Sequence, residues 1–338
     1  MDQSLHRELP NLSIRTLFDG LLAGEQPLEL RRILTQLAEV LLQSVSMQLD
    51  FVGQMMLLSI VFALLSQLET SFTKSSLQKV TGFMVQTIAV LLLLKSSTEV
   101  FSYGQEAMVR LAELMQMLLP IQLLLMAGLG NIQTAGLLQP SLLLIVQLSV
   151  WFFQTVLLPV ITLEFVLKLV NSFSDTYKLQ GLATFLRKLL LTSLAFITML
   201  FLAVLSIQGI SGHVLDRLSL RTAKYFASMA IPMIGGTISG LLETFLSGAM
   251  MIRGAIGFIG LLVVLLLTLV PSVKLLAIYF LYQFTAAILQ PIGDRRITGL
   301  LEQAAGTYML LFAVVALSGV FFFFMILIVL AASGAVLS

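Results

Sequence analysis

The sequence contains no cysteine and only two histidines among its 338 residues. A chain without thiols forms no disulfide, no iron–sulfur cluster and no thiolate zinc site. His6 and His213 lack the spacing of a metal-binding pair, so we expect no metal. His213 and Asp216 could be half of a catalytic triad, but no Gly-x-Ser-x-Gly nucleophile motif accompanies them, and a loop histidine is the simpler interpretation.

Charged residues are also scarce, at 11% of the chain, whereas an average soluble domain has about 25%. Hydrophobic residues make up 58%, and the mean hydropathy is +1.02. This composition excludes a water-soluble enzyme and indicates a polytopic membrane protein. The net charge of +2 is too small to suggest a nucleic-acid partner. No phosphate-binding Gly-x-x-x-x-Gly-Lys-Ser/Thr loop is present, so the chain cannot itself hold a nucleotide in that way, and any energy coupling must come from a partner. We expect no enzyme activity and no cofactor.

Runs without charge locate the membrane spans, since each crossing needs about 20 mostly apolar residues. The two longest runs are 114–163, with 50 residues, and 303–338, with 36. The longer run has room for two crossings around an uncharged turn at 128–136, and Pro140 is well placed to begin a helix. We therefore predict an all-α polytopic membrane bundle with about eight transmembrane helices. The predicted spans are 51–68, 80–98, 111–127, 140–160, 189–210, 254–272, 273–293 and 307–332.

The stretch 225–242 has alternative interpretations. Pro232, Gly235, Gly236 and Gly240 all disfavour an uninterrupted helix. A broken helix at membrane depth persists only where protein or a water-filled cavity covers its freed backbone groups. A re-entrant or discontinuous segment is one interpretation, and a kinked span or an interfacial helix is the other.

The first fifty residues differ from the remainder. Apolar side chains recur at helical spacing at 14–22 and again at 30–41, which predicts amphipathic helices for the membrane interface or a partner. A second amphipathic run at 103–117 contains Glu106 and Arg110, spaced to pair at i and i+4. A signal peptide has a basic segment followed by an apolar one, and this pattern is not visible here. We divide the chain into an amphipathic region, 1–50, and a transmembrane domain, 51–338.

The deep polar side chains inside the predicted spans are scattered amides and hydroxyls, and the amides include Gln54, Gln86, Gln122, Gln147, Gln154, Gln208 and Gln283. Hydrogen bonding between helices explains them most simply, and a polar pore lining is the alternative. Helix breakers next to charges around 228–248 and 268–294 suggest a protein-lined cavity, as in transporters with broken helices. The candidate pore or hinge residues are Pro232, Gly235, Gly236, Glu243, Arg253, Pro271, Lys274, Gln290, Pro291 and Asp294.

Several stretches, in their order and spacing, resemble one known family. They are Ser174–Lys178 with Leu186 and Arg187, Ser206–Gly209, Leu220–Phe226, Ile231–Gly236 and Ala286–Asp294. The chain resembles the stage III sporulation protein AE family of endospore-forming bacteria from about Leu37 to its C-terminus. Each stretch alone would be a weak signal, but the whole set is specific.

The resemblance implies a role in endospore formation. It implies the permease-like component of the stage III A complex in the mother-cell membrane around the forespore. The implied partners are the other stage III A operon proteins, including their ATPase, and, indirectly, stage II sporulation protein Q across the intermembrane space. We also expect a homo-oligomer. The resemblance implies no catalytic, cofactor-binding or metal-binding residue.

Two alternatives compete with a channel core. The chain could be a membrane scaffold that recruits the other complex members, using the amphipathic helices at 12–50 and 103–117. It could also be an independent secondary transporter, which would need inverted repeats, and the sequence has no convincing internal duplication.

Overall fold

The computed structural model describes residues 30–70, 75–128, 132–173, 179–211, 235–291 and 295–331. Within these ranges the chain is helical and contains no strand. The helices are α3 (Leu30–Thr70), α4 (Ser75–Gly128), α5 (Ile132–Trp151), the π-helix η1 (Phe152–Leu157), α6 (Leu158–Ser172), α7 (Gln180–Ser211), α9 (Gly235–Leu289) and α10 (Arg295–Ala331).

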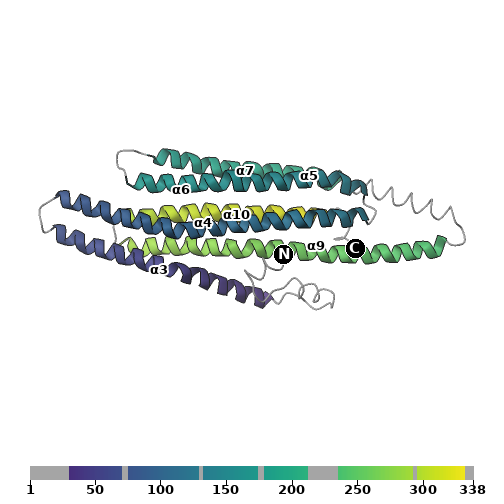
Figure 1. Cartoon of the computed structure of the whole chain (residues 1–338), viewed down its shortest axis with the longest axis horizontal. Helices are drawn as coiled ribbons and strands as arrows, with labels where there is room; N and C mark the ends of the chain where they lie inside the picture. Colours follow the sequence, from purple (N-terminus) through teal and green to yellow (C-terminus); the bar gives the residue numbers. More distant parts are fainter. Residues whose placement is uncertain are drawn as a thin grey trace.

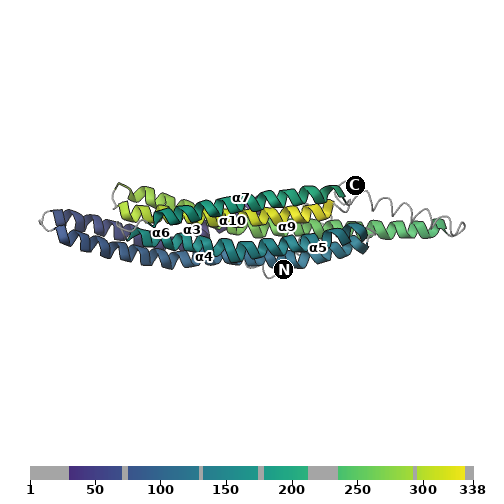
Figure 2. The ribbon, with the colours of Figure 1, turned by 90° about the horizontal axis from the view of Figure 1, so that it is seen from above.

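The helices lie roughly parallel to one long axis and form a rod in both views (Figures 1 and 2). Helices α9 and α10 are antiparallel neighbours at its centre and pack together more extensively than any other described pair. Helices α3 and α4 cover one flank, whereas α6 and α7 cover the other. The apolar core is continuous from α3 to α10 and contains large side chains such as Met55, Phe153 and Phe321.

Small residues allow the central pair to approach closely. A Cβ atom on Gly319 of α10 would overlap the Thr268 side chain of α9, and one on Gly257 of α9 would overlap Leu330. Glycine at such positions is how apolar helices bring their backbones together in lipid. The α9–α10 contact therefore depends on missing side chains as well as on large ones.

Six described helices are long and apolar enough to cross a membrane, so the all-α membrane class is confirmed and the count of eight is not. The predicted spans 80–98 and 111–127 are one continuous helix, α4. Its central charges do not interrupt it, because they lie on its outer face, where Glu106 and Arg110 pair at 2.9 Å. The buried positions Met108 and Leu111 confirm the amphipathic pattern predicted for 103–117.

The predicted break at Pro271 is also wrong, because 254–272 and 273–293 are joined in α9. A proline inside a helix removes one hydrogen bond and crowds the carbonyl of residue i−4, and the packing of the long apolar helix on both sides outweighs this local cost. Likewise, Pro140 lies inside α5, which begins eight residues earlier at Ile132. The turn predicted at 128–136 is therefore shorter than expected: α4 ends at Gly128, and α5 already includes 132–136.

The remaining spans at 51–68, 189–210 and 307–332 fall on α3, α7 and α10, each of which begins before the predicted span. The span predicted at 140–160 continues through η1 and α6 to Ser172. Helix α3 also passes without a break through the boundary at residue 50, so the division at that residue stays a prediction. Of the ambiguous segment 225–242, residues 225–234 lie outside the described part of the chain. The remainder, from Gly235 onward, belongs to α9.

Candidate functional site

A layer of buried polar side chains crosses the rod. Its members come from five helices, α3, α4, α6, α9 and α10, and we call them the polar layer. They are Gln48, Ser96, Ser97, Glu164, Lys168, Tyr282, Thr307 and Tyr308. All are buried except Lys168, whose side chain is 15% exposed. Buried polar groups on this scale are costly unless they pair with one another.

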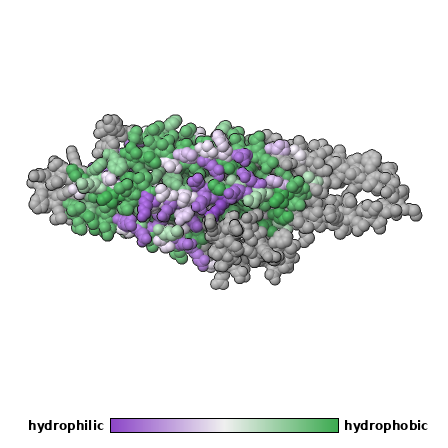
Figure 3. All heavy atoms as spheres, in the orientation of Figure 1, coloured by the Kyte–Doolittle hydropathy of each residue, from purple (hydrophilic) through white to green (hydrophobic). Residues whose placement is uncertain are grey.

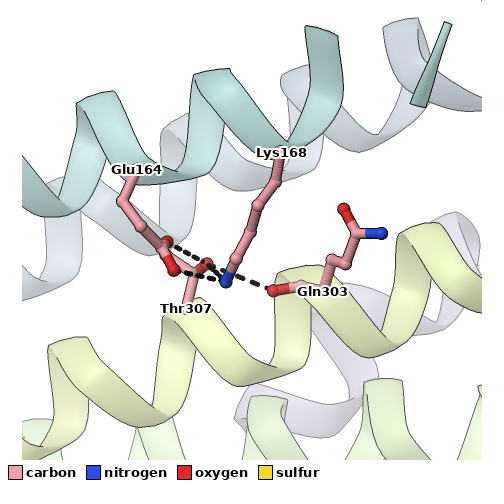
Figure 4. Close-up of polar contacts among 4 residues, drawn as sticks. All are labelled: Glu164, Lys168, Gln303 and Thr307. Carbon is pink, nitrogen blue, oxygen red and sulfur yellow. Dashed lines mark hydrogen bonds and ion pairs between the residues drawn. The ribbon is translucent and has the colours of Figure 1, made fainter. Parts of the chain in front are cut away.

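An ion pair forms the part of the layer between α6 and α10 (Figure 4). Lys168 Nζ lies 2.5 Å from Glu164 Oε1, and the Glu164 side chain is fully buried. Lys168 also donates a hydrogen bond of 3.2 Å to Thr307 Oγ1. The Thr307 hydroxyl lies 2.9 Å from Glu164 Oε2 and 3.1 Å from the Gln303 carbonyl oxygen. The carboxylate thus forms an ion pair through one oxygen and accepts a hydrogen bond from a hydroxyl through the other.

Hydroxyl groups and one amide form the second part of the polar layer, between α3, α4, α9 and α10. Ser96 donates a hydrogen bond of 2.6 Å to Gln48 Oε1, and its oxygen lies 2.6 Å from the Tyr282 hydroxyl. Ser97 Oγ lies 2.7 Å from the Tyr308 hydroxyl. The rings of Tyr282 and Tyr308 meet edge to face, with centroids 5.0 Å apart. Since Tyr308 follows Thr307 in the chain, these rings join the two parts into one layer.

The layer retains unused hydrogen-bonding capacity. The buried Gln303 Oε1 atom has no hydrogen-bond partner among the described residues. A second cation is close by, because a Cβ atom on Gly306 would lie 3.1 Å from Arg187 Nη1. Two cations and one carboxylate thus converge on α10, next to the continuous apolar core. Ionisable groups at membrane depth are functional candidates because burying them is expensive.

Two of the predicted candidates, Pro271 and Lys274, lie together beside α4. They line a small hollow with Tyr103, Glu106 and Arg110, and Lys274 Nζ lies 5.7 Å from the centre of the Tyr103 ring. Pro271 has no N–H to donate to the carbonyl of residue 267, and the hollow opens at that point.

The other candidates are far apart along the same helix. Gly235 and Gly236 begin α9, Glu243 and Arg253 lie within its first half, and Gln290 and Pro291 form the exposed turn after it. Pro232 and Asp294 lie outside the described residues. The side chains of Glu243 and Arg253 are also outside the described part. A helix of 55 residues extends roughly 80 Å at about 1.5 Å per residue, so its two ends do not form one site.

The predicted amides whose side chains the structure describes do not converge on a path inside the bundle. Gln86 donates a hydrogen bond to the Ser172 carbonyl oxygen, as expected for helix bridging. Gln122 is buried and has no hydrogen-bond partner among the described residues. Gln54, Gln147 and Gln283 are exposed, Gln154 is half-buried, and the side chain of Gln208 lies outside the described part.

Sequence reasoning missed the polar layer. Glu164 and Lys168 sit four residues apart within the apolar segment Leu158–Val170, and this spacing is a readable signal of an intramembrane ion pair. No local pattern marks Tyr282, Tyr308, Ser96 and Ser97, because their partners lie 186 and 211 positions away in the chain.

Comparisons with known proteins point in one direction. The family model described as stage III sporulation protein AE matches residues 12–333. The Bacillus subtilis (strain 168) protein named stage III sporulation protein AE is 29% identical over 265 residues, which cover 78% of this chain and 66% of that protein. The match thus spans a little less than two thirds of the relative's length. No solved structure is significantly similar.

Proposed function

This chain belongs to the stage III sporulation protein AE family, and we propose that it is the permease-like membrane core of the sporulation channel complex. It then acts in the mother-cell membrane around the forespore, together with the other stage III A proteins. Their ATPase supplies the energy coupling that this sequence lacks, and stage II sporulation protein Q is the indirect partner across the intermembrane space.

The polar layer carries this proposal. A passive anchor needs only apolar helices, whereas this bundle holds a Glu–Lys ion pair and five buried hydroxyl groups at one level. Ionisable groups inside membrane spans commonly mark the paths of substrates, ions or protons. The buried ion pair therefore supports a membrane core that takes part in transport over one that only anchors the complex.

The test is substitution of the buried carboxylate. Glu164→Gln keeps the shape of the side chain but leaves Lys168 as an uncompensated cation, and we expect a marked fall in heat-resistant spores while the protein still accumulates in the membrane. Glu302→Gln, at an exposed position of α10, is the matched control and should sporulate normally. Normal spore counts from Glu164→Gln would remove the layer from the mechanism.

A non-conducting scaffold is the second candidate function. The described interior favours it, because large side chains such as Tyr282, Tyr308 and Phe153 fill the centre of the bundle. A solute-flux assay on vesicles containing this chain and its operon partners separates the two functions. Flux in any partner combination supports the channel core, and tight vesicles in every combination support the scaffold.

The predicted charges Lys274 and Asp294 have their own test. We expect Lys274→Ala and Asp294→Ala to lower the yield of heat-resistant spores if these side chains serve passage or gating. Wild-type yields from both variants would exclude the two charges from the mechanism.

A further inference from the structure

The outer surface of α4 is hydrophilic at the level where the opposite flank of the rod is apolar. Figure 3 shows hydrophilic residues gathered over the middle of α4 and toward α3. We call this surface the hydrophilic face. Its exposed polar side chains are Glu39, Gln43, Ser46 and Asp50 of α3, Lys95, Glu99, Ser102, Gln105, Glu106, Glu113 and Gln116 of α4, and Gln147 of α5. Val109, which is 38% exposed, lies between Gln105 and Glu113 on the same side of α4.

Helical spacing confirms that the α4 residues form one continuous stripe. Positions 99, 106 and 113 repeat every seven residues and so lie on the same side of the helix. The opposite side of α4 is buried, as Met108, Leu111 and Met115 show. A hollow of about 490 Å³ adjoins the stripe between α4, η1 and α6, and Gln105, Gln154 and Thr162 are among its lining residues. The face therefore has amides and charges, and beside it lies a recess whose lining is partly polar and partly apolar.

The opposite flank at this level has the composition of a lipid-facing surface. Ser318 of α10 lies against Met108 of α4, with Oγ 3.1 Å from Sδ, and the Phe321 ring stacks on Phe201 of α7 at 4.2 Å. Near these contacts, Met199 of α7 is 71% exposed and Val320 of α10 is 46% exposed.

That flank is also long enough to match a bilayer. The charge-free stretches 189–211 of α7 and 303–331 of α10 are roughly 35 and 45 Å long at about 1.5 Å per residue, and the hydrocarbon layer is about 30 Å thick. Acyl chains can cover Met199 and Val320. They cannot cover the ionised stripe on α4 at the same depth, because carboxylates facing lipid are expensive.

We propose that the hydrophilic faces of several copies of this chain surround a shared water-filled passage, an inference that rests on the proposed channel function. Each face carries five carboxylates, at positions 39, 50, 99, 106 and 113, against the cations of Lys95 and Arg110. Such faces repel one another in direct contact, so water separates them. A closed ring of identical copies shields every face from lipid at once, and closed rings are a common oligomeric arrangement. The acidic lining favours cationic or neutral polar solutes.

Cysteine labelling tests the inference, because the chain has no cysteine and each introduced thiol reacts alone. Gln105→Cys and Val109→Cys lie on the hydrophilic face, and Met199→Cys and Val320→Cys are the matched controls at the same level. In native membranes, a permanently charged thiol reagent should modify the first pair on the order of tenfold faster, since the thiolate that reacts forms in water. Equal labelling rates on the hydrophilic face and on the α7–α10 flank would mean that neither surface faces lipid at this depth, and this result would overturn the inference. Unreactive thiols on the hydrophilic face would overturn it too.

A second measurement tests that the neighbours are copies of this chain. A flexible reagent with two thiol-reactive groups should link Gln105→Cys chains into covalent dimers and leave Met199→Cys chains monomeric. Labelling of Gln105→Cys without dimers would mean that another protein or open water covers the face. Labelling reports water access alone, so this inference can fail while the spore counts of Glu164→Gln still support the proposed function.

Discussion

At the scale of single residues, buried groups in this protein act in matched sets. The Glu164 carboxylate is tolerable because Lys168 and Thr307 both contact it. The close contact of α9 and α10 is possible because Gly319 and Gly257 present no side chain. Changing one member of a set should therefore cost more than changing the whole set.

The ion pair gives a direct prediction about coupling. Lys168→Met should destabilise the protein by about 3–5 kcal/mol, because it leaves the Glu164 carboxylate buried without its cation. The double variant Glu164→Gln with Lys168→Met should recover much of that loss. Thermal unfolding in detergent measures both, and a double variant whose loss equals the sum of the single losses would contradict the coupling.

Glycine packing gives a prediction with a control on the same helix. Gly319→Ala places a methyl group into the Thr268 side chain and should cost about 1–3 kcal/mol through overpacking. Gly299→Ala, where no atom lies within 4 Å of the new Cβ, should be neutral or raise stability by up to about 1 kcal/mol. Equal unfolding midpoints for the two variants would show that α9 and α10 separate easily at Gly319.

At the scale of helices, continuity is the main departure from expectation. Charges in α4 and a proline in α9 both predict breaks, yet both helices continue through them. In α4 the charges face outward and leave the buried apolar face intact. In α9 the many apolar contacts with α10 and α3 outweigh one missing hydrogen bond.

The proline in α9 can be tested alone. Pro271→Ala restores an N–H that can bond to the carbonyl of residue 267, so we expect a higher unfolding midpoint, since proline inside a helix costs about 3 kcal/mol relative to alanine. Val273→Ala changes no backbone donor and should show no such rise. If Pro271→Ala is more stable but sporulates poorly, the proline serves as a hinge; a lower midpoint would contradict the packing argument.

At the scale of the whole molecule, length and surface matter together. Helices α4 and α9, with 54 and 55 residues, are each roughly 80 Å long, more than twice the hydrocarbon thickness of about 30 Å. Part of the rod therefore stands outside the hydrocarbon layer if its axis is close to the membrane normal. Exposed apolar side chains such as Phe196, Met199 and Leu124 still need cover where the rod is embedded.

Solubility follows from that surface. We expect the purified protein to stay dispersed only in detergent or lipid and to aggregate when detergent is removed, because exposed apolar side chains then meet water. Size-exclusion chromatography before and after detergent removal measures this. A stable, monodisperse protein in detergent-free buffer would contradict the membrane assignment and remove the physical basis of the proposed function.

The sequence by itself determined the membrane class and the helical content, because composition and charge-free runs record burial in lipid directly. It also indicated the family, through the order and spacing of several short stretches. It also determined the pairing of Glu106 with Arg110, since i and i+4 neighbours meet on any helix. Only the tertiary structure decided that charges and prolines leave α4 and α9 unbroken, since packing by other helices settles that competition. It alone joined Ser96 to Tyr282 and Ser97 to Tyr308, because contacts between distant positions depend on how helices are arranged in space.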